Sequence, residues 1–141
     1  MSKKRAGKGK NLKPFMEGVL EFDGRGAFHL TAGRCGRCGS RFFPKRIFCP
    51  ACGSGSVRAI RIKGKGKVYT YTVCRVGPPG IKTPYAIGYV DVKGVRVFGR
   101  FEGWEKTPLR IGREVELIPF FEESRDSGEK LVSYRFEVKD G

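Results

Sequence analysis

The 141-residue sequence predicts a mainly β protein, with a short N-terminal helix, a zinc ribbon and then a five- to six-stranded barrel. Three observations predict this order. Two Cys-x-x-Cys pairs stand within residues 35–52, runs of β-branched and aromatic residues fill the remainder, and no helical periodicity extends past residue 21. A chain of this length can bury one modest hydrophobic core and form one small additional domain. A ribbon this small has no core of its own, so its folding depends on the bound metal.

The first 33 residues divide into a basic tail, residues 1–13, and a segment over 14–33. The tail carries six lysines and arginines and no acid, so we expect it to be disordered. Pro14 suits the first turn of a short amphipathic helix, which Gly18 weakens. This helix either packs on its own domain or docks on a partner. The apolar side chains at helical spacing are Phe15, Met16, Val19 and Leu20, of which we assign Phe15, Met16 and Leu20 to a partner interface. Residues 28–32 form a short strand that leads into the ribbon.

The zinc ribbon is expected over residues 34–56. Its two Cys-x-x-Cys pairs are separated by ten residues, a spacing that aims four thiolates at one tetrahedral point. The expected metal ligands are Cys35, Cys38, Cys49 and Cys52. Iron would accept the same ligands, and two disulfides or four unrelated thiols are the alternatives without a metal.

The loop between the two cysteine pairs carries more apolar side chains than so small a module can bury. They are Phe42, Phe43, Ile47 and Phe48, interleaved with Arg41, Lys45 and Arg46. Some of them must pack on the next domain or face a partner. We assign Phe42 and Phe43 to the partner interface that also includes the N-terminal helix.

The barrel domain is expected over residues 57–141. Its strands are predicted at residues 57–62, 68–76, 85–92, 95–101, 114–121 and 131–138. Lys93-Gly94 is a turn between two of them, which makes a hairpin. Five or six short strands with such a hairpin suit a Greek-key barrel of the OB type.

Charge is distributed unevenly along the chain. The formal net charge is +15, and the stretch from Arg34 to Lys82 contains twelve lysines and arginines without one acid. This basic stretch implies an anionic partner, which is nucleic acid, a phosphorylated cofactor or an acidic protein surface; the alternative is a solvated basic surface. The four residues 64–67, Gly-Lys-Gly-Lys, are either a cradle for phosphate or a flexible turn.

No set of residues typical of a catalytic site is apparent. The one histidine, His29, is expected to be structural, Cys74 to be a buried small residue, and Glu122 and Glu123 to be solvated. The sequence has neither a run of about 20 apolar residues nor the apolar core of a signal peptide. We therefore expect a protein of the reducing cytoplasm without activity of its own.

Together the motifs resemble a known family: the acyl-CoA-associated OB-fold proteins with an N-terminal rubredoxin-like zinc ribbon. The resemblance covers nearly everything after residue 13. It rests on an ordered series of short motifs, which are Pro14-Phe15, residues 34–39, Phe43-Pro44, residues 48–50, 52–54 and 64–72, Pro84-Tyr85, residues 94–97, Gly99-Arg100, Ile111-Gly112 and residues 115–117. The basic tail and the longer segment over 21–27 depart from the family pattern.

The resemblance implies a non-catalytic subunit that pairs with a thiolase-superfamily enzyme, or with a hydratase or aldolase acting on acyl-CoA. Among partners of this kind, the resemblance favours benzylsuccinyl-CoA thiolase. By the same resemblance the zinc is structural and the OB fold helps to enclose CoA or its acyl group. Basic residues suit the phosphates of CoA, and the expected CoA-binding residues are Lys63, Lys65, Lys67, Arg75 and Lys82.

Two other functions fit the same residues. A single-stranded nucleic-acid-binding protein would also use a basic OB fold with aromatic side chains, although we do not expect nucleic acid as the partner. A rubredoxin-like electron carrier would hold iron in place of zinc.

Overall fold

The computed structural model describes residues 12–16, 18–22, 28–123 and 128–139. It divides into two compact units, one formed by residues 1–63 and 119–133 and the other by residues 64–118 and 134–141. The described residues form strands and turns, and none of them lies in a helix. Within this part of the chain there is accordingly no helix with the length and apolar character that a membrane crossing requires.

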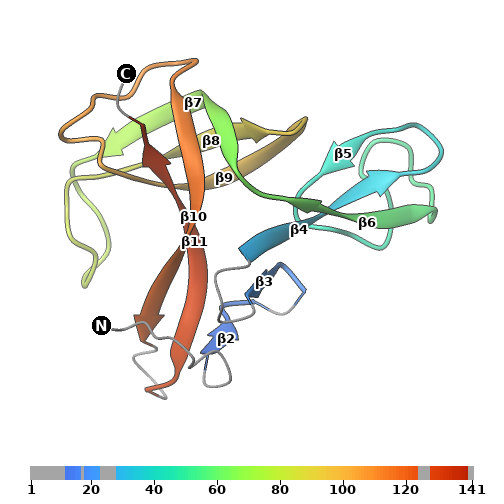
Figure 1. Ribbon diagram of the computed structural model, residues 1–141, viewed down its shortest axis with the longest axis horizontal. Coiled ribbons are helices and arrows are strands. Elements are labelled where there is room, and N and C mark those ends of the chain that lie inside the picture. Colours follow the sequence, from blue (N-terminus) through green and yellow to red (C-terminus); the bar gives the residue numbers. More distant parts are fainter. Residues whose placement is uncertain (1–11, 17, 23–27, 124–127, 140–141) are drawn as a thin grey trace. The chain divides into compact units, whose positions relative to one another are not determined.

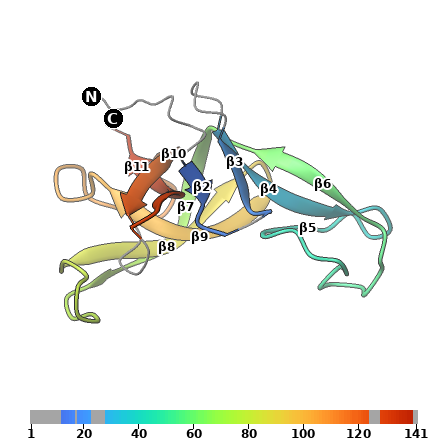
Figure 2. The same ribbon diagram turned by 90° about the horizontal axis from the view of Figure 1, so that it is seen from below.

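The first unit is built around strand β4 (Phe28–Cys35). Strand β6 (Val57–Ile62) pairs antiparallel with one edge of β4, and Figure 2 shows the two side by side. The short strands β3 (Leu20–Phe22) and β5 (Arg41–Phe42) pair with successive parts of the other edge. Alternation along β4 buries the side chains of Leu30 and Ala32 completely.

The predicted N-terminal helix is wrong for the described residues. Strand β2 (Leu12–Pro14) instead pairs in parallel with Lys130–Val132, so two residues assigned to the basic tail belong to a sheet. The next backbone amide, that of Phe15, donates to the carbonyl of Val132 at 2.9 Å. Gly18 then adopts a left-handed φ of 78°, which a helix does not allow. Residues 1–11 of the predicted tail lie outside the described residues.

The predicted barrel is built around the second unit, and it closes with five strands. They are β7 (Lys65–Cys74), β8 (Tyr85–Val92), β9 (Val95–Glu102), β10 (Glu114–Glu123) and β11 (Lys130–Val138). Residues 119–123 of β10 and 130–133 of β11 fall in the first unit. Neighbours pair in the order β10-β7-β8-β9-β11, and pairing of β10 with β11 closes the circle (Figure 1). Strand β6 belongs to the first unit because it pairs with β4. The boundary of the barrel domain at residue 57 therefore stays a prediction.

The core of the barrel consists of alternating inward side chains, as a half-buried sheet requires. Val90, Val97 and Phe136 are completely buried. The β8–β9 hairpin turns at Lys93 and Gly94, whose φ angles of 50° and 82° suit a two-residue turn that needs left-handed backbone at both positions. The sequence therefore predicted this hairpin correctly.

Candidate functional site

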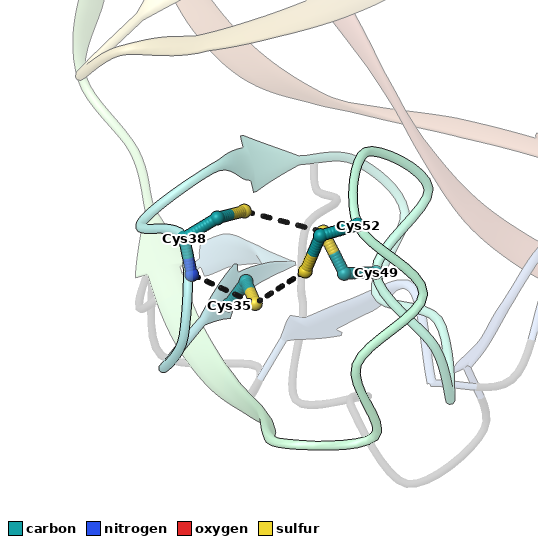
Figure 3. A group of neighbouring side chains, drawn as sticks. All are labelled: Cys35, Cys38, Cys49 and Cys52. Carbon is teal, nitrogen blue, oxygen red and sulfur yellow. Dashed lines mark hydrogen bonds between the residues drawn. The ribbon is translucent and has the colours of Figure 1, made fainter.

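Two turns of the same construction present the four cysteines (Figure 3). In the first turn, which follows β4, the amides of Arg37 and Cys38 point at the Sγ of Cys35, at 3.3 and 3.4 Å. In the second, the amide of Ala51 donates to the Sγ of Cys49 at 3.3 Å. Each turn ends on a left-handed glycine, Gly39 or Gly53, whose amide donates to the carbonyl of the first cysteine of its pair. Glycine at these two positions lets the backbone amides turn toward the sulfur atoms, as expected from the sequence.

The four sulfur atoms have the geometry of a tetrahedral metal site. All lie within 4.8 Å of one another, and the Sγ atoms of Cys35 and Cys52 are 3.6 Å apart. A metal with four bonds of about 2.3 Å to sulfur separates its ligands by roughly 3.8 Å. Disulfide sulfurs are only about 2.05 Å apart, and all four cysteines are free thiols in the structure. The donor set therefore fits a divalent metal and not two disulfides.

Electrostatics in the cluster favour an added cation. The amide of Cys38 lowers the pKa of the Cys35 thiol to about 6 against the effect of burial. At Cys52 a hydrogen bond from Ser54 lowers the pKa, but burial and the three neighbouring cysteines raise it to about 11. Without a cation the four sulfurs cannot all carry negative charge. A bound divalent ion removes that repulsion, because thiolates are the form that binds metal.

The predicted partner-interface residues do not share one exposed surface. Leu20 is buried, with 3% of its side chain exposed, whereas Phe15 and Met16 are exposed at 37% and 54%. Phe42 lies over Gly33, where an added Cβ would meet its ring at 2.7 Å, and Phe43 is half-buried. The most exposed apolar side chains of the ribbon are instead Ile47 at 77% and Phe48 at 62%. Both belong to the apolar residues noted in the loop between the cysteine pairs. The sequence did not show which of those apolar side chains pack inward and which stay exposed.

The structure separates the predicted CoA-binding residues into groups. Lys65 and Lys67 lie on the outer face of β7, near its start, and Arg75 and Lys82 lie in the connection after its end. At about 3.3 Å per residue, the ten-residue strand holds these two groups about 30 Å apart. Lys63 precedes β7 and falls in the first unit. All five side chains are exposed, and Lys65 pairs with Glu114 at 3.3 Å.

Residues 64–67 form neither of the two structures considered for them. Gly64 is a turn residue with a φ of 91°, but β7 begins at Lys65. Gly66 is buried in the sheet, and an added Cβ would meet the carbonyl oxygen of Asp91 at 2.6 Å. Its backbone is therefore committed to the barrel and cannot wrap a phosphate.

The two other residues considered singly in the sequence, His29 and Cys74, lie within strand pairs. His29 lies across the strand pair from Glu21, with its Nε2 atom 3.6 Å from the carboxylate, and burial lowers the pKa of His29. Cys74 is half-buried at the end of β7, opposite Tyr85. Sequence analysis did not single out the outward aromatic residues of β7–β9. These residues could have been found from the sequence, because each of three consecutive predicted strands has an aromatic residue at an outward position.

Comparisons with known proteins agree with this architecture. Residues 22–58 match the sequence model described as "ChsH2, rubredoxin-like zinc ribbon domain", and residues 59–118 match "ChsH2, C-terminal OB-fold domain". Among curated proteins, the chain is 35% identical to benzoylsuccinyl-CoA thiolase subunit BbsA of Thauera aromatica, over 96% of this chain and 98% of the relative. It is 33% identical to a DUF35 domain-containing scaffold protein of Methanothermobacter thermautotrophicus, over 79% and 86%.

A solved structure is similar as well. The structure described as the Ltp2-ChsH2(DUF35) aldolase contains a chain that superposes with a TM-score of 0.58 at 28% identity. The match covers 77% of this chain and 84% of that one. The similarity therefore includes most of both chains and is not confined to the cysteine cluster.

Proposed function

The chain belongs to the ChsH2/DUF35 family of zinc-ribbon and OB-fold proteins, and we propose that it is a non-catalytic accessory subunit of a thiolase-superfamily enzyme acting on acyl-CoA. The observation that carries the proposal is the end-to-end similarity to a thiolase subunit, at 35% identity over 96% of this chain and 98% of the relative. Because nearly the whole of each protein is matched, the similarity includes both the ribbon and the barrel, and this supports the same role for the complete chain. The sequence adds support, since it has one histidine and no pattern of an activated nucleophile.

The proposed substrate is an aromatic succinyl thioester of CoA. The relatives in Thauera aromatica and Geobacter metallireducens are named for benzoylsuccinyl-CoA, at 35% and 32% identity. That name specifies a benzoyl group where the resemblance seen in the sequence suggested a benzyl group. An aldolase is the second candidate partner because of the similarity to the Ltp2-ChsH2(DUF35) chain. The thiolase is favoured because the match to its subunit is closer in identity and covers more of this chain.

The proposed metal is zinc with a structural role. Cys35, Cys38, Cys49 and Cys52 would hold it, and four sulfur ligands fill a tetrahedral site without leaving a position for substrate. When bound, the ion supplies a cross-link between two turns that have little hydrophobic core of their own. The ribbon residues contribute the amide hydrogen bonds that keep each thiolate aimed at the centre. An electron carrier would need iron at this position, because zinc has no redox chemistry.

The proposed contact with the enzyme includes the tip of the ribbon. Ile47 and Phe48 are more than half exposed and follow Lys45 and Arg46 directly. Residues 34–56 contain five lysines and arginines and no acid, so an acidic rim around an apolar pocket would complement this tip. Phe15, Met16 and Phe43 remain candidates for the same interface. A tip fixed by metal loses little conformational entropy on binding.

Binding of CoA by this chain is part of the proposal, and it is confined to one of the two basic groups. A single diphosphate cannot contact both Lys65–Lys67 and Arg75–Lys82, since a whole strand separates them. Lys65 and Lys67 are the favoured group because they project from the same face of β7 two residues apart. CoA bound there would add phosphate contacts to a substrate site that the enzyme subunit supplies.

Co-expression with the thiolase subunit of the same organism tests the proposal. We expect the two chains to co-purify as a stable hetero-oligomer, and the isolated chain to have neither thiolysis nor condensation activity. Affinity purification through a tag on this chain, followed by mass measurement of the intact complex, gives the composition. Persistent separation of the two proteins, or turnover by the isolated chain, would contradict the proposal.

A further inference from the structure

We propose that the outward face of strands β7–β9 is a second docking surface of this protein, which takes an acidic protein patch with an apolar centre. The proposal rests on the proposed function, since the enzyme subunit is the occupant to which it commits. The face belongs wholly to the barrel unit. It is therefore distinct from the ribbon tip, which belongs to the other unit.

Three aromatic side chains lie exposed on this face. Tyr69 and Tyr89 are each 44% exposed, and Phe98 is 46% exposed. Tyr89 and Phe98 are directly opposite each other on β8 and β9, and their rings meet edge to face at 5.3 Å. Burial alternates along both strands, so these rings point away from the barrel core. The barrel fold does not need exposed rings at these positions, and clustered exposed apolar groups mark interaction sites.

An arginine lies over the third ring. The guanidinium carbon of Arg96 lies 3.5 Å from the centre of the Tyr69 ring. Its Nε donates to the Asp91 carboxylate at 2.9 Å, and that hydrogen bond raises the pKa of Arg96. Arg100 lies two outward positions further along β9 and is likewise close to a ring, 4.9 Å from the ring centre of Tyr85. Side chains held in this way are ordered before binding, which reduces the entropy that binding costs.

Charge and composition select the occupant. Strands β7–β9 carry four lysines and arginines against two acids, in a chain of net charge +15, so a second copy of the chain would be repelled. Single-stranded nucleic acid needs cations for its phosphates and open ring faces on which its bases stack. Here Arg96 lies over the ring of Tyr69 and Arg100 over the ring of Tyr85, so these arginines cover ring faces that bases would use. Tyrosine and arginine are the residues that dominate the binding energy of protein interfaces. These observations favour a protein with complementary acidic charge.

The test is a binding titration of the thiolase subunit with the full chain and its variants. Phe98→Asp and Arg96→Glu should each raise the Kd at least tenfold, while zinc content and melting temperature stay unchanged. Val76→Asp is the matched control for the first, since Val76 is 88% exposed in the connection after β7. Arg58→Glu, on exposed positions of β6 in the other unit, is the control for the second. Both controls should bind within twofold of the wild type. If an acidic variant fails to fold, Tyr69→Ala tests the same face with a milder change.

Each other result overturns the inference in a recognisable way. If the wild type binds the enzyme and both face variants bind equally well, the face is not the docking surface, while the proposed function stands. If the variants lose only the binding of a single-stranded oligonucleotide, the face is a nucleic-acid platform. If the wild type alone dimerises and the variants do not, the occupant is a second copy. If the wild type does not bind the thiolase subunit at all, the proposed function fails as well.

Discussion

The Sγ of Cys38 lies 3.7 Å from the Sγ of Cys49, although eleven positions separate them in the chain. This separation matches the edge of a tetrahedron with metal–sulfur bonds of about 2.3 Å. Each sulfur comes from a different turn, so a metal at the centre would join the two ends of the loop that carries the exposed ribbon tip. Metal binding and the geometry of the proposed contact are therefore linked.

Replacing one ligand should release the metal. We expect Cys49→Ser to abolish stoichiometric zinc binding, since a hydroxyl is a poor substitute for a thiolate. Structural zinc in such modules supplies about 10–16 kcal/mol of apparent binding free energy, so the ribbon should also lose its fixed structure. Elemental analysis of the purified protein measures the first effect, and proteolysis within residues 34–56 measures the second. Cys74→Ser is the control, and it should retain one zinc. Equal zinc in the wild type and Cys49→Ser would contradict the ligand assignment.

The barrel core should be sensitive to loss of one ring. Phe136 is completely buried in β11, and its ring lies 6.2 Å from that of Phe101. Removing a buried phenylalanine side chain costs about 3–5 kcal/mol, and we expect Phe136→Ala to lower the free energy of unfolding by that amount. Chemical denaturation followed by circular dichroism measures it. Val76→Ala, at an exposed position, should change the stability by less than about 0.5 kcal/mol. A similar loss for the two variants would mean that β11 does not supply the barrel core.

The two basic groups around β7 should differ in their effect on CoA. We expect the double variant Lys65→Ala/Lys67→Ala to weaken CoA binding by the complex, because it removes two positive charges on one face of the strand. The matched double variant Arg75→Ala/Lys82→Ala removes the same charge about 30 Å away and should leave the affinity unchanged. Calorimetry at two salt concentrations measures both. A shallow salt dependence is expected, because CoA offers few phosphates compared with a nucleic-acid strand. Equal losses for the two variants would indicate a general charge effect.

Removal of residues 1–11, which leaves strand β2 in place, separates CoA binding from unspecific binding of nucleic acid. These residues carry five cations without an acid, so they should account for most of any binding to single-stranded oligonucleotides. We expect the truncated protein to keep its affinity for CoA in the complex and to lose the oligonucleotide. A filter-binding assay at physiological salt measures the second property. Tight oligonucleotide binding by the truncated protein, without affinity for CoA, would favour the nucleic-acid function.

The parts that could be predicted from sequence are those in which neighbouring residues decide the structure. Tyr85–Val92 was predicted with both ends correct, because its alternation leads directly into the Lys93-Gly94 turn. The cysteine cluster was predicted because each pair forms its own turn, and the ten residues between them are long enough to bring the turns together.

The parts that could not be predicted depend on residues far away in the chain. The helical spacing of Phe15 to Leu20 did not reveal that the preceding strand pairs with Lys130–Val132. Nor did the loop sequence show that Phe42 covers Gly33 while Ile47 stays exposed, since β4 must first be in place. The basic stretch looked continuous in sequence. The extended geometry of β7 places its members at opposite ends of a strand.

The central claim is that this chain completes an enzyme without performing its chemistry, and one measurement tests it most directly. Thiolysis of benzoylsuccinyl-CoA by free CoA should be measured for this chain alone, for the thiolase subunit alone and for the two reconstituted together. The account predicts no turnover by this chain alone and a turnover by the reconstituted complex that exceeds that of the thiolase subunit alone. Turnover by this chain alone, or a thiolase subunit whose activity and substrate affinity are unchanged by adding it, would contradict the account.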